Sequence, residues 1–232
     1  MVSIIVPVLN EEKTIENLLV NLKRLKGEKE ILIIDGGSKD STTDVASQYG
    51  KVIKSKKGRS NQMNCGAKEA NGNILWFVHS DSIVHYESIV AIEKAIKDGY
   101  IGGGFPIYFC DLNSLFMKYI SKTSNIRADK FNIYYGDQGI FVKKDIFLNM
   151  GGYPSLDIME DLEFSFRLRR LGKLKLLPYY IGTSARRFKK GGQFKTHILM
   201  HKLRILYFMG VPTEKLNKIY RREGNECTYN ND

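Results

Sequence analysis

Residues 74–84 read ILWFVHSDSIV, an apolar run that holds the chain's only tryptophan and ends abruptly in polar side chains. An apolar run bounded by turn-forming residues is typical of a buried strand. Asp81 stands just beyond the last apolar residue, where a carboxylate has two possible uses. It can cap the helix that follows, or it can hold a metal ion at the end of the strand.

Three shorter apolar runs precede this stretch, at residues 2–10, 30–35 and 51–55. Between the first two, isoleucine and leucine recur at helical spacing from residue 15 to residue 25, and Gly27 ends the pattern. Strands that alternate with helices indicate an α/β protein with a parallel sheet and helices on both faces.

The rhythm changes after Gly99. The sequence predicts a strand broken by glycines at residues 100–109 and a helix at 112–125. It then predicts a strand with a short helix and a glycine turn at 138–153, a strong helix followed by a strand at 158–178, and a last helix at 191–210. Neither a linker nor a shift in composition separates the two halves, so we expect one domain.

Composition is that of a globular protein, with 43% hydrophobic and 26% charged residues in a chain of 232. No apolar run is long enough to suggest a membrane span, and the first residues lack the basic region of a signal peptide. Cys65, Cys110 and Cys227 form neither a metal-ligand spacing nor an even disulfide set. We therefore expect free thiols in a reducing, cytoplasmic environment.

The formal net charge of +11 is unevenly placed. Residues 183–232 hold 11 lysines and arginines against 4 acids, a net charge of +7, and residues 1–182 carry +4. Anionic lipid, nucleic acid or phosphorylated substrates suit such a surface, and a solvated surface is the simpler alternative. Nucleic acid is disfavoured because no motif of stacking aromatic and basic residues accompanies the charge.

Polar side chains follow each predicted strand of the first half. In a parallel sheet, ligands bind at the carboxyl ends of the strands, so these side chains share one edge. They offer acceptors for a base and ribose, donors for phosphate and a carboxylate for a cation. Asp35 before two glycines is also an ordinary strand-to-turn signal. The residues are Pro7, Asn10 and Glu11, then Asp35 and Gly37, then Arg59, then Asp81.

The second half adds further carboxylates. Asp137 lies beside a glycine turn, and Glu160 and Asp161 begin a predicted helix. Acids in the first turn of a helix stabilise its dipole, which is the structural alternative for this pair. A carboxylate near a cleft can instead take a proton from a hydroxyl nucleophile.

Four blocks carry a family resemblance: SIIVPVLNEEKTIENLL at 3–19, ILIIDGGSKDST at 31–42, GRSNQMNCGAKEANGNILWFVHSDS at 58–82 and GGYPSLDIMEDLEFSFRLRRLG at 151–172. In order and spacing they resemble family 2 glycosyltransferases over roughly residues 2–180. The third block and TSARRFKKGG at 183–192 further resemble a small soluble subgroup associated with radical-SAM and selenodomain proteins. The resemblance implies the GT-A fold, a Rossmann-like, mostly parallel sheet, here with a C-terminal helical segment.

The family's nucleotide-binding residues correspond to Pro7, Asn10, Glu11, Asp35, Gly37, Arg59, Asn64 and His79. Its Asp-x-Asp metal motif falls on residues 79–81, where His79 replaces the first acid and Asp81 is kept. The resemblance implies that Asp81 binds Mg²⁺ or Mn²⁺, since such an ion needs few carboxylates once phosphates are present. His79 is interpreted as a hydrogen-bonding replacement rather than a metal ligand.

The family's catalytic pair corresponds to Glu160 and Asp161, with Asp161 as the general base of an inverting transfer. Asp137, Gln138, Arg186 and Arg187 are expected near the acceptor or the donor sugar, although a solvated surface is the alternative for the two arginines. The Gln-x-x-Arg-Trp motif and membrane helices of processive members are absent from the sequence, which favours transfer of a single sugar. A UDP-sugar is the favoured donor, with GDP next.

Two other functions remain as alternatives. A sugar nucleotidyltransferase shares the α/β sheet, but it needs a glycine-rich basic loop where this chain has PVLNEEKT at 7–14. A catalytically silent nucleotide-sugar-binding module is the other. Retention of both Asp81 and Asp161 weighs against silence.

The resemblance divides the chain at residue 182. Residues 1–99 are expected to bind the nucleotide, residues 100–182 the acceptor, and residues 183–232 to form a basic helical extension packed on the same domain. The last long helix mixes apolar and basic residues between 194 and 209. It is interpreted either as a packed helix with a basic outer face, or as one that rests on an anionic membrane at the inner face and serves a lipid-linked acceptor.

Overall fold

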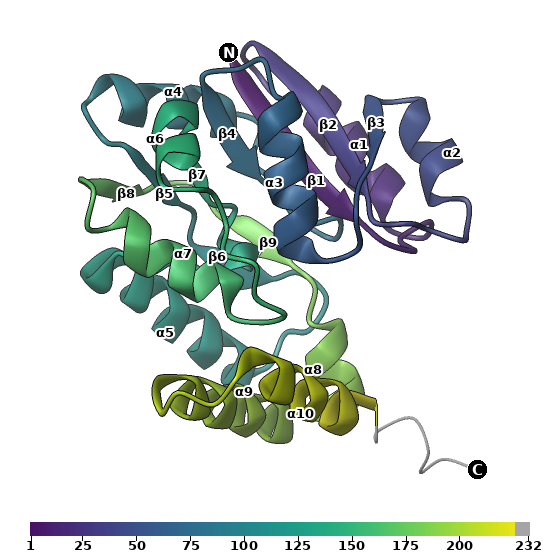
Figure 1. The fold of residues 1–232 in the computed structure, drawn as a ribbon, viewed down its shortest axis with the longest axis vertical. Coiled ribbons are helices and arrows are strands. Elements are labelled where there is room, and N and C mark those ends of the chain that lie inside the picture. Colours follow the sequence, from purple (N-terminus) through teal and green to yellow (C-terminus); the bar gives the residue numbers. More distant parts are fainter. Residues whose placement is uncertain (226–232) are drawn as a thin grey trace.

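Seven strands form one sheet in the order β3-β2-β1-β4-β7-β5-β8, in a computed structural model that describes residues 1–225 (Figure 1). The first four strands in this order are parallel, whereas β7 runs antiparallel to β4 and β5. The predicted α/β class and mostly parallel sheet are confirmed. The strands are β1 (Val2–Val8), β2 (Lys29–Asp35), β3 (Lys51–Lys54), β4 (Ile74–Phe77), β5 (Gly102–Gly104), β7 (Phe141–Lys143) and β8 (Leu174–Leu176).

The register of the parallel strands brings the expected polar ends together. Val8 at the end of β1 pairs with Asp35 at the end of β2, and Asp35 pairs with Lys54 at the end of β3. The last residue of β4, Phe77, lies opposite Ile5, so the polar residues after β4 follow the same edge. The edge predicted to bind ligands is therefore continuous.

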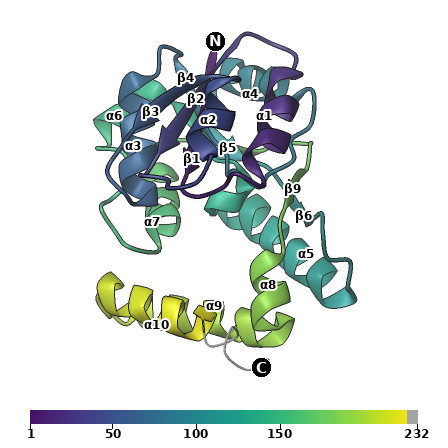
Figure 2. The same cartoon turned by 90° about the vertical axis from the view of Figure 1, so that its right-hand side faces the viewer.

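Helices cover both faces of the sheet (Figures 1 and 2). One face packs against α1 and α4, and the other against α3, α5, α6 and α7. The leucine pattern of the first helix is buried as its spacing predicts. The helices are α1 (Ile15–Lys23), α2 (Thr42–Ser47), α3 (Arg59–Glu69), α4 (Ser88–Lys97), α5 (Leu115–Phe131), the 3₁₀ turn η1 (Gly136–Gln138), α6 (Lys144–Asn149) and α7 (Glu160–Leu168).

Trp76 explains the aromatic in the quoted stretch. Its side chain is buried, and its indole N–H donates a 3.1 Å hydrogen bond to the carbonyl oxygen of Gly139. Its ring lies 5.4 Å from that of Phe105. A buried tryptophan usually finds such a partner, and this one ties β4 to the turn after η1.

The C-terminal helices are α8 (Arg186–Gly191), α9 (Gln193–Phe208) and α10 (Thr213–Asn225). Leu199 and Leu203 of α9 pack with Leu216 of α10 and with Leu162 of α7. Figure 2 shows α9 and α10 below the sheet, with α8 leading down to them from β9. Within residues 1–225, no helix is both long and apolar enough to span a bilayer.

The remaining expectations concern the short strands, the cysteines and the division of the chain. A short parallel pair, β6 (Ile107–Phe109) with β9 (Ile181–Thr183), leads into α8, and the sequence patterns gave neither β9 nor α8. Cys65 and Cys110 are free thiols, whereas Cys227 and the polar residues from 226 onward lie outside the described residues. The division at residue 182 stays a prediction.

Candidate functional site

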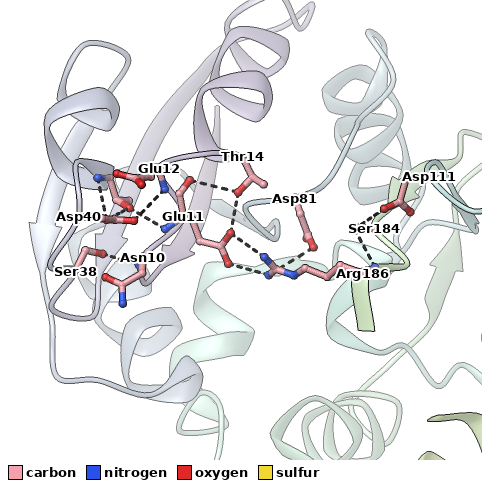
Figure 3. Close-up of polar contacts among 11 residues, drawn as sticks. Asn10, Glu11, Glu12, Thr14, Ser38, Asp40, Asp81, Asp111, Ser184 and Arg186 are labelled. Atoms are coloured by element: carbon pink, nitrogen blue, oxygen red, sulfur yellow. Dashed lines mark hydrogen bonds and ion pairs between the residues drawn. The ribbon is translucent and has the colours of Figure 1, made fainter. Parts of the chain in front are cut away.

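The loops after β1 and β2 interlock at the sheet edge (Figure 3). Asn10, at a left-handed φ of 54°, accepts a 2.8 Å hydrogen bond from the backbone of Lys39 and donates its own N–H to the Ser38 hydroxyl. Asp35 accepts hydrogen bonds from the backbone N–H groups of Gly37 and Ser38. The strand-to-turn role of Asp35 is therefore real, and it shapes the loop at the sheet edge without excluding a ligand contact.

Arg186 joins two carboxylates of this edge (Figure 3). Its guanidinium donates to both carboxylate oxygens of Glu11, at 2.8 and 3.2 Å, and lies 3.8 Å from Oδ2 of Asp81. Burial acts to raise the pKa of Glu11, but the hydrogen bonds from Arg186 and Thr14 outweigh it, so this pKa is lowered. Asp81 keeps a raised pKa because its burial outweighs the attraction of Arg186.

Asp81 does not cap a helix. The next helix, α4, begins at Ser88 with Glu87 at the N-cap position. The capping alternative for Asp81 is therefore wrong, and its carboxylate stands at the end of β4 beside Glu11 and Arg186.

The side chain of His79 lies against Gly136, the residue that precedes Asp137. A Cβ atom added to Gly136 would be 2.7 Å from Nε2 of His79, so only glycine fits without a shift. This nitrogen is buried and has no hydrogen-bond partner among the described residues, and the predicted role of His79 in nucleotide binding stays a prediction. Burial, with repulsion from Arg59 and Arg186, lowers the pKa of His79 to about 3, which keeps the ring neutral.

Asp161 is held by backbone on both sides. Oδ2 accepts a 2.8 Å hydrogen bond from the Gly136 N–H, and Oδ1 accepts one of 2.8 Å from Leu162. Because α7 begins at Glu160, the first-turn alternative for the acid pair also holds. The link to Gly136 is additional, and it fixes the carboxylate at the η1 turn.

Two further carboxyl groups flank Asp161. Burial and the nearby charge of Asp161 raise the pKa of Glu160 to about 7, although Arg59 lies 3.4 Å away and opposes the shift. Burial likewise raises the pKa of Asp137 to about 6, against the attraction of Arg127. Oδ1 of Asp137 is buried and without a hydrogen-bond partner among residues 1–225. Groups with such pKa values can exchange protons near neutral pH.

Three arginines give the site a positive side. Arg187 lies over the ring of Tyr220 at 4.0 Å, and burial with repulsion from Arg59 and Arg186 lowers its pKa to about 10. Arg59 in turn attracts both Asp81 and Glu160, so it connects the acids of the two halves. Converging guanidinium groups of this kind suit a phosphate or diphosphate.

Two predicted contact residues are engaged elsewhere. Asn64 donates to the carbonyl oxygen of Tyr153 at 2.8 Å and accepts from its N–H at 2.9 Å. Gln138 is 0% exposed, and its carbonyl oxygen accepts from Arg127 while its amide donates to Phe105. These contacts favour a structural role for both residues over the predicted ligand contacts.

Sequence reasoning missed the residue that positions Arg186. Asp111 accepts hydrogen bonds from the Ala185 N–H and the Ser184 hydroxyl, and it pairs with Lys189 at 3.1 Å (Figure 3). These contacts fix the start of α8. The available signal was an acid just after β6, the same strand-end pattern that identified Asp35 and Asp81.

The metal-binding capacity of the site is limited. Among the described residues, no group of three or more histidines, cysteines and acids is arranged to hold a metal ion. Mg²⁺ and Mn²⁺ nevertheless bind through one or two carboxylates when a ligand supplies phosphate oxygens. Asp81, at the carboxyl edge of the sheet, can bind a metal ion in that way, but it cannot form a site from protein ligands alone.

Comparisons with known proteins agree on one family. The model for "Glycosyl transferase family 2" matches residues 3–153. The chain is 23% identical over 198 residues to the probable glycosyltransferase YdaM of Bacillus subtilis. This match covers 74% of this chain and 47% of YdaM. The chain spans about half the length of the curated relatives it matches.

Solved structures show the same fold. Staphylococcus aureus TarS 1–349 in complex with UDP-GlcNAc matches with a TM-score of 0.61 and 21% identity, over 77% of this chain and 57% of that 1–349 chain. The mannosyltransferase PcManGT from Pyrobaculum calidifontis, in complex with GDP-Man and Mn²⁺, matches with a TM-score of 0.65 and 15% identity. That match covers 97% of this chain and 69% of PcManGT.

Proposed function

Since the chain belongs to glycosyl transferase family 2, we propose that it transfers a single sugar from a nucleoside-diphosphate sugar to a hydroxyl acceptor, with inversion at the anomeric carbon. The observation that carries this proposal is the meeting of Asp81, Asp161 and three arginines at the carboxyl edge of the sheet. An acid for a cation, an acid for a proton and cations for a diphosphate are the groups that this reaction requires.

The donor is proposed to bind along the first half of the edge. The Asn10 and Asp35 loops lie where parallel α/β sheets bind nucleotides. Arg186, which binds Glu11 after the same strand, and its neighbour Arg187 are proposed to meet the diphosphate. TarS was solved with UDP-GlcNAc and PcManGT with GDP-Man, which supports a UDP-sugar or a GDP-sugar here. We favour UDP and place GDP next.

We propose that Asp81 holds Mg²⁺ or Mn²⁺ together with the donor's diphosphate. Such an ion supplies positive charge that stabilises the departing nucleoside diphosphate. The presence of Mn²⁺ with PcManGT supports this, and so does the position of Asp81 just after β4 at the carboxyl edge of the sheet. Because protein ligands are few, metal and nucleotide should bind together rather than separately.

Asp161 is the proposed general base. The acceptor oxygen attacks the anomeric carbon, the bond from that carbon to the diphosphate oxygen breaks, and the hydroxyl proton passes to Asp161. The backbone of Gly136 and Leu162 orients the carboxylate for this step. A single displacement of this kind inverts the configuration, as in other glycosyl chemistry that uses one base.

A binding screen followed by product analysis tests the proposal. Calorimetry of UDP-, GDP- and dTDP-sugars with and without Mg²⁺ or Mn²⁺ should show one preferred donor and a metal-dependent affinity. Asp81→Asn should abolish the metal dependence, whereas Asp129→Asn on the exposed side of α5 should leave it unchanged. Nuclear magnetic resonance of the product then shows the anomeric configuration.

Three results would contradict parts of the proposal. If the parent protein binds the nucleotide equally well with and without metal, the proposed cation at Asp81 is wrong. If the product retains the anomeric configuration of the donor sugar, the proposed single displacement is wrong. Release of pyrophosphate from a nucleoside triphosphate and a sugar phosphate would indicate a nucleotidyltransferase instead.

A further inference from the structure

Helix α9 has two apolar sides, and only one of them is covered. Leu199 and Leu203 are 6% and 0% exposed and pack inward with α7 and α10. At about 100° per residue, the remaining large apolar residues fall on the opposite side of the helix. This outer stripe consists of Phe194, Ile198, Ile205 and Met209, with exposures of 66%, 66%, 59% and 73%, whereas the ring of Phe208 lies 5.9 Å from that of Phe166 on α7.

The outer stripe continues onto the start of α5. The ring of Phe116 lies 4.2 Å from that of Phe194, which joins the two helices. Leu115 and Tyr119, on either side in the chain, are 86% and 54% exposed. Single exposed apolar residues are ordinary on a protein surface, but a contiguous group of this kind marks an interaction surface.

Positive charge flanks the outer stripe. Lys195 and Lys202 lie about 80–100° around α9 from Phe194, on one border of the stripe, and both are exposed. Lys190 precedes the helix, and residues 183–232 carry a net charge of +7. Apolar side chains bordered by lysines are the pattern of a helix that lies in the surface of an anionic bilayer.

We propose that the outer stripe docks on an anionic membrane, with Phe194, Ile198 and Ile205 inserted among the acyl chains and Lys195 and Lys202 on the headgroups. The helix would lie parallel to the surface, since it is too short and too polar to span it. Each lysine near such a surface contributes attraction that salt weakens. The surface therefore needs both anionic lipid and low salt for its tightest binding.

A second copy of the chain fits this surface less well. A two-fold contact through the outer stripe would bring two basic extensions together, each with a net charge of +7. Like charges at that separation repel, and the repulsion is not relieved by acids on the stripe, because none occurs between residues 193 and 209.

Docking would also orient the site. Arg186 begins α8, and the six residues of α8 span about 9 Å before α9 begins. The arginine end of the site would then lie beside the bilayer. If the proposed glycosyl transfer is correct, this placement suits an acceptor carried on a lipid or at the membrane surface.

Vesicle co-sedimentation of the full chain tests the docking. Phosphatidylcholine vesicles with phosphatidylglycerol should sediment the protein at low salt, and vesicles without it, or high salt, should sediment much less. The double variant Ile198→Ser with Ile205→Ser should bind at least tenfold more weakly, since two exposed apolar side chains are lost. Its matched control, Leu148→Ser with Leu171→Ser, removes two similarly exposed aliphatic side chains elsewhere and should bind as the parent does.

The charge is tested in the same way. Lys195→Gln with Lys202→Gln should weaken binding about tenfold or more. The control Lys94→Gln with Lys97→Gln changes two lysines of α4, at the opposite end of the molecule, and should have little effect (Figure 1).

Three outcomes would overturn the docking. The first is failure to sediment with anionic vesicles at low salt. The second is equal loss in test and control variants. The third is a dimer in light scattering that the isoleucine variant disperses, which would assign the stripe to a second copy. Donor affinity measured by calorimetry is independent of vesicles, so failure here leaves the proposed transfer untouched.

Discussion

The backbone nitrogen of Gly136 lies 2.8 Å from Oδ2 of Asp161, so a turn from outside α7 holds the candidate base. The other oxygen of Asp161 is fixed by Leu162. Hydrogen bonds from fixed backbone groups keep a carboxylate in one orientation without the entropy cost of ordering another side chain. The carboxylate of Asp161 is therefore held in place before any substrate binds.

Replacement of Asp161 by asparagine should lower transfer by about 10²-fold or more, because the amide cannot accept the proton. Donor affinity should change little. The amide group must also face either Gly136 or Leu162 with a donor in place of an acceptor, at a cost of about 1–3 kcal/mol in the free energy of unfolding. Kinetics and unfolding should therefore be measured on the same preparation.

Asp137→Asn is the comparison for that variant, since Asp137 is the next candidate base. If Asp161→Asn transfers sugar at near the parent rate while Asp137→Asn does not, the base is Asp137. Asp161 would then serve only to begin α7.

Gly136→Ala should destabilise the fold by about 1–3 kcal/mol, because its Cβ would lie 2.7 Å from Nε2 of His79. His79→Ala in the same chain removes the obstructing ring and should recover most of the lost stability. A double-mutant cycle by chemical denaturation measures this coupling. Additive effects of the two substitutions would show that the ring is not what excludes a side chain at residue 136.

Glu160 should make the protein less stable as pH rises. Its folded-state pKa of about 7 lies above the ordinary 4.5, so the folded protein retains a proton that the unfolded chain releases between these values. The free energy of unfolding therefore falls from about pH 4.5 to pH 7, by roughly 3 kcal/mol for this group.

Glu160→Gln removes this loss, so the variant's advantage over the parent protein should be larger at pH 8 than at pH 4. Urea denaturation at both pH values measures it, and Glu69→Gln at an exposed position is the control. An advantage that does not change with pH would mean that burial does not hold the proton on Glu160.

Arg186→Gln should increase the affinity of the nucleotide-free protein for Mn²⁺. Glu11 and Asp81 share one guanidinium, which competes with a metal for the same carboxylates. The free energy of unfolding should fall by about 1–3 kcal/mol, because the Glu11 side chain is only 14% exposed and would lose the guanidinium that satisfies its carboxylate. Electron paramagnetic resonance of free Mn²⁺ reports binding directly, with the exposed Arg170→Gln as control, and an unchanged affinity would show that Arg186 does not compete with the metal.

Much of the sheet edge could be predicted from the sequence because it depends on local patterns. Apolar runs place Asp35 and Asp81 after strands, and parallel strands end at one edge. The first-turn acids likewise locate the start of α7 at Glu160. These features need only neighbouring residues to specify them.

The parts that could not be predicted depend on partners far away in the sequence. Asn64 binds the backbone of Tyr153, 89 positions later, so its type and its place in a motif say nothing of its partner. β9 has only three residues, and α8 has six with four of them basic, so neither has a periodic pattern. The neutral state of His79 likewise follows from burial against Gly136, which no local pattern shows.

The contact between Arg186 and Glu11 also indicates when the site is completed during synthesis of the chain. The two residues are 175 positions apart, whereas the four parallel strands are complete at Phe77. Since a chain emerges from its N-terminus, the sheet edge with Glu11 and Asp81 can form while α8 is still being made, and long-range contacts form late. A nascent chain thus has its nucleotide loops and Arg59 before it has Arg186 and Arg187, so Glu11 gains its guanidinium partner only after most of the chain has been made.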